Sequence, residues 1–180
     1  MVFNKYKEKG AYHWKMYQKN AKYKRHVDYV VKWVSPGKIL DIGAGDGLIT
    51  SKIKAEGIDN NERAVALANE KGVDVRLGSA YDLPLGRKYD RICLLDVIEH
   101  LQDYKLALEQ IKKILNVNGE LYVCTPPYTG KGKYNGMNSE YHYFEWTPEQ
   151  FRFEMEQSGF RTISLEDNSE LTRMYGKFKL

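Results

Sequence analysis

Short apolar runs alternate with amphipathic segments along most of this chain. The runs are rich in isoleucine, leucine and valine and are bounded by glycine, proline, asparagine or aspartate, whereas the segments between them repeat apolar residues at helical spacing. The pattern predicts strands at 38–42, 57–59, 74–77, 90–95, 120–124, 160–165 and 172–178. It predicts helices at 20–34, 48–54, 62–71, 104–115 and 148–158. Strands that alternate with helices in this way indicate an α/β fold with a parallel sheet.

The first predicted strand runs directly into a glycine-rich turn. The glycines of this turn are Gly43, Gly45 and Gly47. Glycine lets the backbone turn tightly and approach a ligand closely. The dinucleotide-binding fingerprint needs its third glycine one residue later, where this chain has Leu48. Because Asp41 ends the strand and Asp46 lies in the turn, their carboxylates would repel a pyrophosphate. A cationic ligand such as S-adenosylmethionine, with its ammonium and sulfonium groups, suits this turn better.

Two segments carry a resemblance to a known family. Residues 39–47, ILDIGAGDG, resemble motif I of the class I S-adenosylmethionine-dependent methyltransferases. Residues 57–61, GIDNN, resemble the second strand of that family, whose final carboxylate binds both ribose hydroxyls of the cofactor. The resemblance implies a Rossmann-like, doubly wound α/β fold, with a mainly parallel seven-stranded sheet and an antiparallel last strand. It also implies S-adenosyl-L-methionine as the cofactor.

Asp59 is the candidate partner of the ribose. In a βαβ unit, an acidic residue roughly 20 positions beyond the glycine turn presents an acceptor to the ribose. The alternative is that Asp59 only caps the following helix, although Asn60 or Asn61 could cap that helix instead. The motif and its spacing together favour ribose binding.

Residues 78–84 resemble the loop that flanks adenine in the same family, often with an aspartate where this chain has Ser79. The Ser79 hydroxyl and the Ala80 backbone amide could still contact the ring edge. The cofactor-binding residues that the resemblance implies are Asp41, Gly43, Ala44, Gly45, Asp59, Asn60, Ser79, Ala80, Leu95 and Asp96.

Residues 95–101, LDVIEHL, resemble the segment after the fourth strand in that family, at the sheet edge where α/β proteins bind ligands. His100 could accept the proton of the methyl-accepting group because an imidazole titrates near neutrality, and Asp96 or Glu99 could orient it. The alternative is that Glu99 and His100 only hold this segment beneath the cofactor. The predicted catalytic residues are His100, Glu99 and His142.

A metal site is a further alternative. If residues 96–100 form a helical turn, two carboxylates and an imidazole share one face and, with His142, could hold magnesium or manganese. The candidate ligands are Asp96, Glu99, His100 and His142. They resemble the E-x-x-E-H motif, and the histidine before FEWT, of metal-dependent enzymes that methylate the 2′-hydroxyl at small-RNA 3′ ends. Small-molecule methyltransferases share both motifs, so we predict no metal and a small-molecule acceptor, with RNA as the alternative partner.

The N-terminal part of the chain is predicted to be a helical cover, residues 1–35, ahead of a cofactor-binding domain at 36–180. The first 33 residues hold nine lysines or arginines against two acids, with aromatic residues between the cations. Such a segment could bind nucleic acid, but the net charge of +4 over the whole chain is mild and favours an amphipathic cover. The residues expected to close over the ligand are Tyr12, His13 and Trp14.

Length and composition fit one compact unit, with 180 residues of which 42% are hydrophobic. No stretch approaches about 18 consecutive apolar residues, and the N-terminus lacks the apolar run of a signal peptide. We therefore expect a cytoplasmic protein with no membrane partner. Cys93 and Cys124 lie in apolar runs and are expected to be ordinary buried core residues.

The predicted function is S-adenosylmethionine-dependent methyl transfer to an oxygen or nitrogen atom of a small metabolite. The first alternative is divalent-metal-dependent 2′-O-methylation of RNA 3′ ends. The second is a regulatory or scaffold protein that binds the cofactor without turnover, because a fold and a cofactor-binding loop do not by themselves fix an activity.

Overall fold

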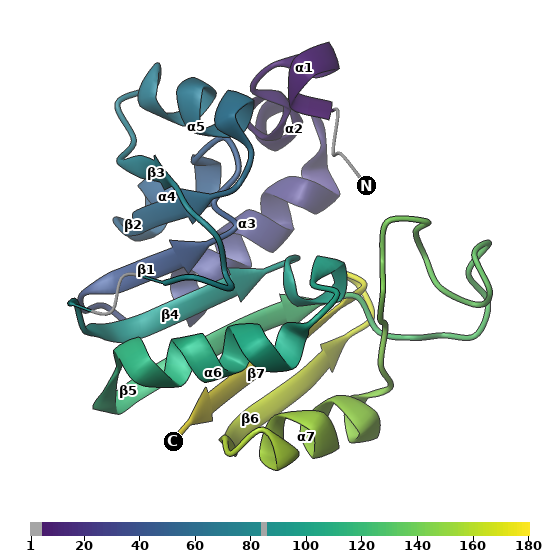
Figure 1. The fold of residues 1–180 in the computed structure, drawn as a ribbon. Coiled ribbons are helices and arrows are strands. Elements are labelled where there is room, and N and C mark those ends of the chain that lie inside the picture. The colour runs from purple at the N-terminus through teal and green to yellow at the C-terminus, as the bar shows by residue number, and fades with distance from the viewer. Residues whose placement is uncertain (1–4, 84–85) are drawn as a thin grey trace.

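A seven-stranded sheet forms the centre of the structure (Figure 1). The computed structural model describes residues 5–83 and 86–180. Within them the strand order is β3-β2-β1-β4-β5-β7-β6. The strands are β1 Ile39–Ile42, β2 Glu56–Asp59, β3 Val75–Leu77, β4 Tyr89–Leu95, β5 Leu115–Thr125, β6 Arg161–Asn168 and β7 Arg173–Lys179. The first five strands pair in parallel, and β7 is antiparallel to both β5 and β6, which confirms the predicted fold class.

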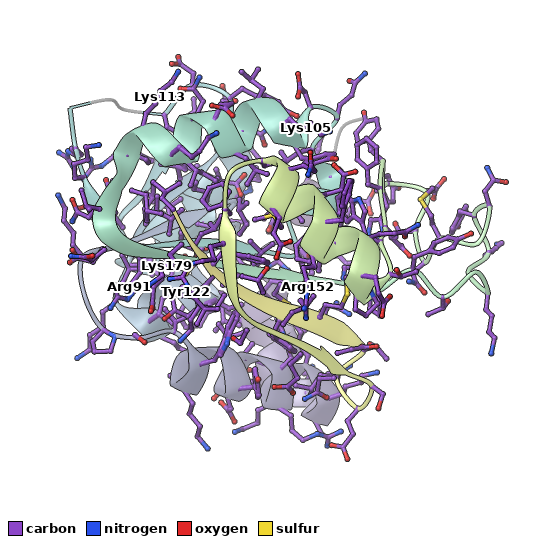
Figure 2. All side chains as sticks on the ribbon, turned by 90° about the horizontal axis from the view of Figure 1, so that it is seen from below. Arg91, Lys105, Lys113, Tyr122, Arg152 and Lys179 are labelled. Carbon is purple, nitrogen blue, oxygen red and sulfur yellow. The ribbon has the colours of Figure 1, made fainter. Side chains whose placement is uncertain are left out.

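Helices cover both faces of this sheet (Figures 1 and 2). They are α1 Lys5–Lys9, α2 Tyr12–Lys19, α3 Ala21–Trp33, α4 Leu48–Ile53, α5 Glu62–Asn69, α6 Tyr104–Ile114 and α7 Pro148–Gln157, with a 3₁₀ turn at Ile98–His100. Helices α6 and α7 bury Leu108 and Phe151 in one apolar cluster, whereas α3 and α4 bury Val30 and Ile53 in another. Figure 2 shows these two layers on opposite sides of the strands. Among the described residues, no helix is both long and apolar enough to cross a membrane.

Strand β4 is the central strand of the sheet. Residues 92–95 of this strand are all buried, as expected for a central parallel strand covered on both faces. Cys93 in this run and Cys124 in β5 are buried free thiols, as predicted. The ligand-binding residues that follow β4 are therefore attached to a rigid element.

Side-chain caps explain where several helices begin. Asn20 accepts a hydrogen bond from the Tyr23 amide at 2.9 Å, and Asp103 accepts one from Leu106 at 3.0 Å. Thr147 starts α7 through a reciprocal capping box with Gln150. These polar residues stand where the predicted helices start, so most predicted boundaries lie within one or two residues of the observed ones.

Two parts of the prediction are wrong. The strand predicted at 120–124 is longer than expected, since β5 begins at Leu115, which is buried and pairs with Tyr89. The pairing then jumps to Arg91 with Glu120, so residues 116–119 bulge from the ladder. The cover also has two further helices, α1 and α2, ahead of the predicted one. These two helices are too short for a helical periodicity to be recognised in the sequence.

The two leucines of α6 test this packing. Leu108 is completely buried against the sheet, whereas Leu106 on the same helix is 42% exposed. We expect Leu108→Ala to lower the free energy of unfolding by about 2–5 kcal/mol, because it removes buried methyl groups and leaves a cavity. Leu106→Ala is the matched control and should cost less than about 0.5 kcal/mol. Equal losses in urea unfolding of the two variants would contradict the assigned faces of α6.

Candidate active site

A cavity of about 1230 Å³ lies at the carboxyl ends of β1, β2 and β4. Its walls come from the glycine turn, the end of β2, the segment after β4, the N-terminal helices and the long loop after β5. Figure 1 shows that loop projecting beyond the sheet before α7. All predicted cofactor-binding and catalytic residues except Gly45 line this cavity, as do Tyr12 and His13 but not Trp14 of the cover. The topology thus collects side chains from distant parts of the sequence at one edge of the sheet.

The glycine turn packs too tightly for side chains. Gly43 has φ of +77° and Gly45 has φ of +57°, values that favour glycine. A Cβ atom on Gly43 would collide with the Val97 side chain, and one on Gly45 would collide with the Tyr6 hydroxyl. The turn is therefore held between the segment after β4 and the N-terminal cover.

Asp59 closes the other side of the turn. Its two carboxylate oxygens accept hydrogen bonds from the backbone amides of Gly45 and Asn61, each at 2.8 Å. Partial burial raises the pKa of Asp59. Helix α5 is capped by Asn61, whose side chain accepts from two backbone amides of the first turn at 3.1 Å. Because Asn61 does the capping, each Asp59 oxygen keeps a second lone pair for a ligand in the cavity.

The two aspartates of the turn have different partners. Asp41 is buried and accepts a hydrogen bond from the Thr50 hydroxyl at 2.6 Å, and burial raises its pKa to about 7. The Asp46 carboxylate instead accepts from the His13 backbone amide at 3.0 Å. The Asp46 carbonyl accepts from the Trp14 indole at 2.8 Å. Asp46 thus anchors the cover to the glycine turn, a role that its position in the sequence did not indicate.

The predicted adenine loop lies beside the cavity after β3. The Ser79 hydroxyl accepts a hydrogen bond from the Tyr81 amide at 3.1 Å, and both Ser79 and Ala80 line the cavity. The last residue of the matched segment, Pro84, lies outside the described residues.

Asp96 occupies a strained position directly after β4. Its φ is +56°, which is uncommon for a residue other than glycine. The backbone amide donates to the Cys124 carbonyl at 2.8 Å, and the Arg173 guanidinium donates to the carboxylate at 2.6 Å. Burial alone would raise the pKa of Asp96, but the charge of Arg173 holds it below its usual range.

Three of the four candidate metal ligands come together. Ligand atoms of Glu99, His100 and His142 lie within 4.8 Å of one another, and we call these residues the Glu99 cluster. Asp96 is not part of it, because the helical turn covers only residues 98–100 and Arg173 holds Asp96 elsewhere. The prediction that Asp96 shares one face of a helical turn with Glu99 and His100 is therefore wrong.

Hydrogen bonds orient each member of the Glu99 cluster. The Thr125 hydroxyl donates to Glu99 at 3.0 Å, and burial raises the pKa of Glu99 to about 8. The Nδ1 atom of His100 lies 3.0 Å from the Tyr141 carbonyl, and that of His142 bonds to Glu145. Burial lowers the pKa of His100. Both imidazoles thus use Nδ1 for support, which leaves Nε2 for a ligand.

Sequence reasoning missed several residues of the cavity wall. They are Tyr6, Tyr23, His26 and Arg173. His26 and Tyr23 lie on the amphipathic helix α3, and Arg173 begins the last strand, so none belongs to a recognisable motif. Only the packing of the two chain ends beside β4 could reveal them.

Comparisons with known proteins indicate the family of this chain. A family model described as a methyltransferase domain matches residues 15–165. A ubiquinone biosynthesis O-methyltransferase of Azorhizobium caulinodans is 31% identical over 139 residues, which are 69% of this chain and 55% of that protein. The chain spans about half the length of the first curated relatives it matches.

Solved structures share the fold. A possible histamine N-methyltransferase from Thermotoga maritima superposes with a TM-score of 0.78 at 17% identity, over 98% of this chain and 99% of the other. The magnesium protoporphyrin IX methyltransferase of Synechocystis, with bound S-adenosylhomocysteine, has a TM-score of 0.71 at 18% identity, over 98% and 97% of the two chains. Because the family model covers most of the sequence and the fold agrees, this chain belongs to the family of methyltransferase domains, as its glycine turn predicted.

Proposed function

We propose that this chain is an S-adenosylmethionine-dependent methyltransferase that acts on an oxygen or nitrogen atom of a small metabolite. The observation that carries the proposal is one cavity that joins the glycine turn, Asp59 and the Glu99 cluster. The bound cofactor would supply an electrophilic methyl group on its sulfonium. The named O-methyltransferase relatives support a small-molecule acceptor, although they are longer than this chain.

The residues around the turn fit a cationic cofactor. Asp41 is a buried carboxyl with a hydroxyl partner and a raised pKa, so a nearby ammonium or sulfonium would stabilise its charged form. Asp59 offers lone pairs to the ribose hydroxyls, with Asn60 beside it. Ser79 and Ala80 border the adenine. The other residues assigned to the cofactor are Gly43, Ala44, Gly45, Leu95 and Asp96.

His100 is the proposed proton acceptor of the transfer. Its lowered pKa keeps the ring neutral near pH 7, and the Tyr141 carbonyl holds the proton at Nδ1. The Nε2 atom can then take a proton from the acceptor, while the Glu99 carboxylate and the His142 ring lie close to the imidazole. The loop at 126–141 would shape the acceptor entrance because its residues line the cavity mouth.

The Glu99 cluster also favours a second candidate, metal-dependent 2′-O-methylation of RNA 3′ ends. Two imidazoles and one carboxylate can hold a divalent ion, and both histidines have Nδ1 oxygen partners of the kind that orient metal ligands. Such an ion would bind the ribose 2′- and 3′-hydroxyls and lower the pKa of the nucleophile. The cluster supplies three ligands rather than the four expected, so we rank this candidate second.

The helical cover, residues 1–35, is proposed to close over the ligand bound to the domain at 36–180. The structure describes this cover from residue 5 onward. Its Tyr12 and His13 line the cavity, and Trp14 is fixed to the glycine turn through its indole. Aromatic residues in such a cover exclude water from the sulfonium.

Cofactor binding tests the glycine turn and Asp59. We expect Gly43→Val and Asp59→Ala to weaken S-adenosylhomocysteine binding at least about tenfold, or about 1.4 kcal/mol, in calorimetric titration. Asp74→Ala is the matched control, because Asp74 is an exposed aspartate paired with Arg76 on the next strand. Tight binding of NAD without binding of S-adenosylhomocysteine would contradict the assignment.

Chelation separates the two candidate acceptors. We expect labelled methyl transfer to a small-metabolite pool to survive EDTA, and His142→Ala to impair acceptor use more than cofactor binding. Glu149→Gln is the control, because Glu149 is an exposed residue of α7 that does not line the cavity. Activity that requires manganese or magnesium and labels RNA 3′ ends would reverse the ranking. Label transfer to neither pool, with or without metal, would favour a regulatory protein without turnover.

Removal of residues 1–16 tests the cover. The truncation removes α1 and part of α2 but no strand, so the sheet should stay folded. We expect the dissociation rate of S-adenosylhomocysteine, measured by stopped flow, to rise at least about tenfold. Trp14→Phe keeps an aromatic ring but loses the bond to Asp46, and should give a smaller rise. Unchanged rates in both variants would rule out a closing role.

A further inference from the structure

A histidine and an aspartate face each other on the cavity wall without a direct hydrogen bond. His26 Nε2, from α3, lies 4.0 Å from Asp96 Oδ2, at the end of β4. The His26 side chain is only 7% exposed, and both residues line the cavity. The function proposed above gives His26 no role and assigns Asp96 only to the lining of the cofactor site, because it uses the Glu99 cluster for proton transfer.

The opposite atom of each group is firmly held. His26 Nδ1 lies 2.8 Å from the Tyr175 hydroxyl, and Asp96 Oδ1 accepts from Arg173 Nε at 2.6 Å. Arg173 is itself fixed by a bond from Nη1 to the Thr172 carbonyl at 2.9 Å. Strand β7 therefore aims both the imidazole and the carboxylate at the gap between them.

On the basis of the proposed methyl transfer, we propose that His26 and Asp96 bind a neutral hydroxyl group of the acceptor. The hydroxyl would donate to Asp96 Oδ2 and accept from His26 Nε2. An oxygen can lie at an ordinary hydrogen-bond distance of about 2.8 Å from both atoms, because their separation of 4.0 Å is shorter than two such bonds. The pair is thus a determinant of acceptor specificity.

Charge selects a neutral hydroxyl over other polar groups. The Arg173 guanidinium already balances Asp96, and burial lowers the pKa of His26 so that the ring is neutral. Burial raises the pKa of Tyr175, which keeps its proton and can donate it to His26 Nδ1. An ammonium group would be repelled by Arg173, and a carboxylate would face Asp96. A hydroxyl adds no charge and can both donate and accept.

The neighbouring rings favour a planar acceptor. The Tyr23 ring lies 5.9 Å from His26, and the His13 ring stacks on Tyr23 at 5.8 Å with an interplanar angle of 18°. Both Tyr23 and His13 line the same cavity. Aromatic rings prefer such offset or edge contacts with other aromatic groups. The chemical class that fits is a neutral hydroxyl on a flat, apolar ring.

Histidine NMR can observe this site directly. The chain has four histidines, so ¹⁵N-histidine spectra of the S-adenosylhomocysteine-loaded protein can be assigned with single His→Gln variants. The probes are catechol, 1,2-dimethoxybenzene, which lacks the hydroxyl protons, and benzylamine, which is cationic. We expect catechol alone to shift the His26 Nε2 resonance. No shift of His26 with catechol, or an equal shift with either other probe, would overturn the inference.

Matched variants separate specificity from folding. His26→Ala should weaken catechol binding about three- to tenfold, the usual effect of one lost hydrogen bond, and leave S-adenosylhomocysteine binding within about twofold. His26→Gln retains a donor and should restore most of the affinity. Unchanged catechol binding in folded His26→Ala would also overturn the inference. Failure of the wild-type protein to bind S-adenosylhomocysteine at all would instead overturn the proposed function.

Discussion

The glycine turn after β1 is the constraint on which the rest of the site depends. Its backbone is too close to Val97 and Tyr6 to admit side chains at Gly43 and Gly45. One amide of the turn donates to Asp59, which fixes the end of β2 beside it. The Asp46 carboxylate and carbonyl then hold the N-terminal cover. Residues 43–47 therefore position Asp59, the segment after β4 and the cover together.

Buried carboxyl groups in the cavity wall favour the binding of a positively charged group. Asp41 and Glu99 are buried beside hydroxyl groups, and burial raises the pKa of both carboxyl groups because it disfavours their charged forms. Asp96 has Arg173 as its counterion, and its pKa is lowered. A cationic cofactor beside Asp41 would stabilise its ionised form, and a bound divalent ion would do the same for Glu99. The cofactor end and the acceptor end of the cavity thus differ in how their charge is balanced.

The proposed acceptor side of the cavity is built from both ends of the chain. Helix α3 supplies Tyr23 and His26, strand β7 supplies Arg173 and Tyr175, and the loop after β5 supplies His142. These elements are attached to the sheet that carries the glycine turn but have no part in forming the turn. Acceptor choice can therefore vary while the cofactor side stays constant, which agrees with the different acceptors named for proteins of this fold.

The sequence by itself determined the sheet, most helix starts and the position of the cofactor-binding turn, because these depend on local periodicity, capping residues and glycine conformation. Asp59 could be placed near the turn since the length of a βαβ unit limits where its second strand ends. Only the tertiary structure decided that Asp96 pairs with Arg173 and leaves the Glu99 cluster, because that ion pair joins residues 77 positions apart. It likewise brought His26 and Tyr175, 149 positions apart, into contact. Such long-range pairings depend on how helices and strands pack, and no local pattern in one sequence records them.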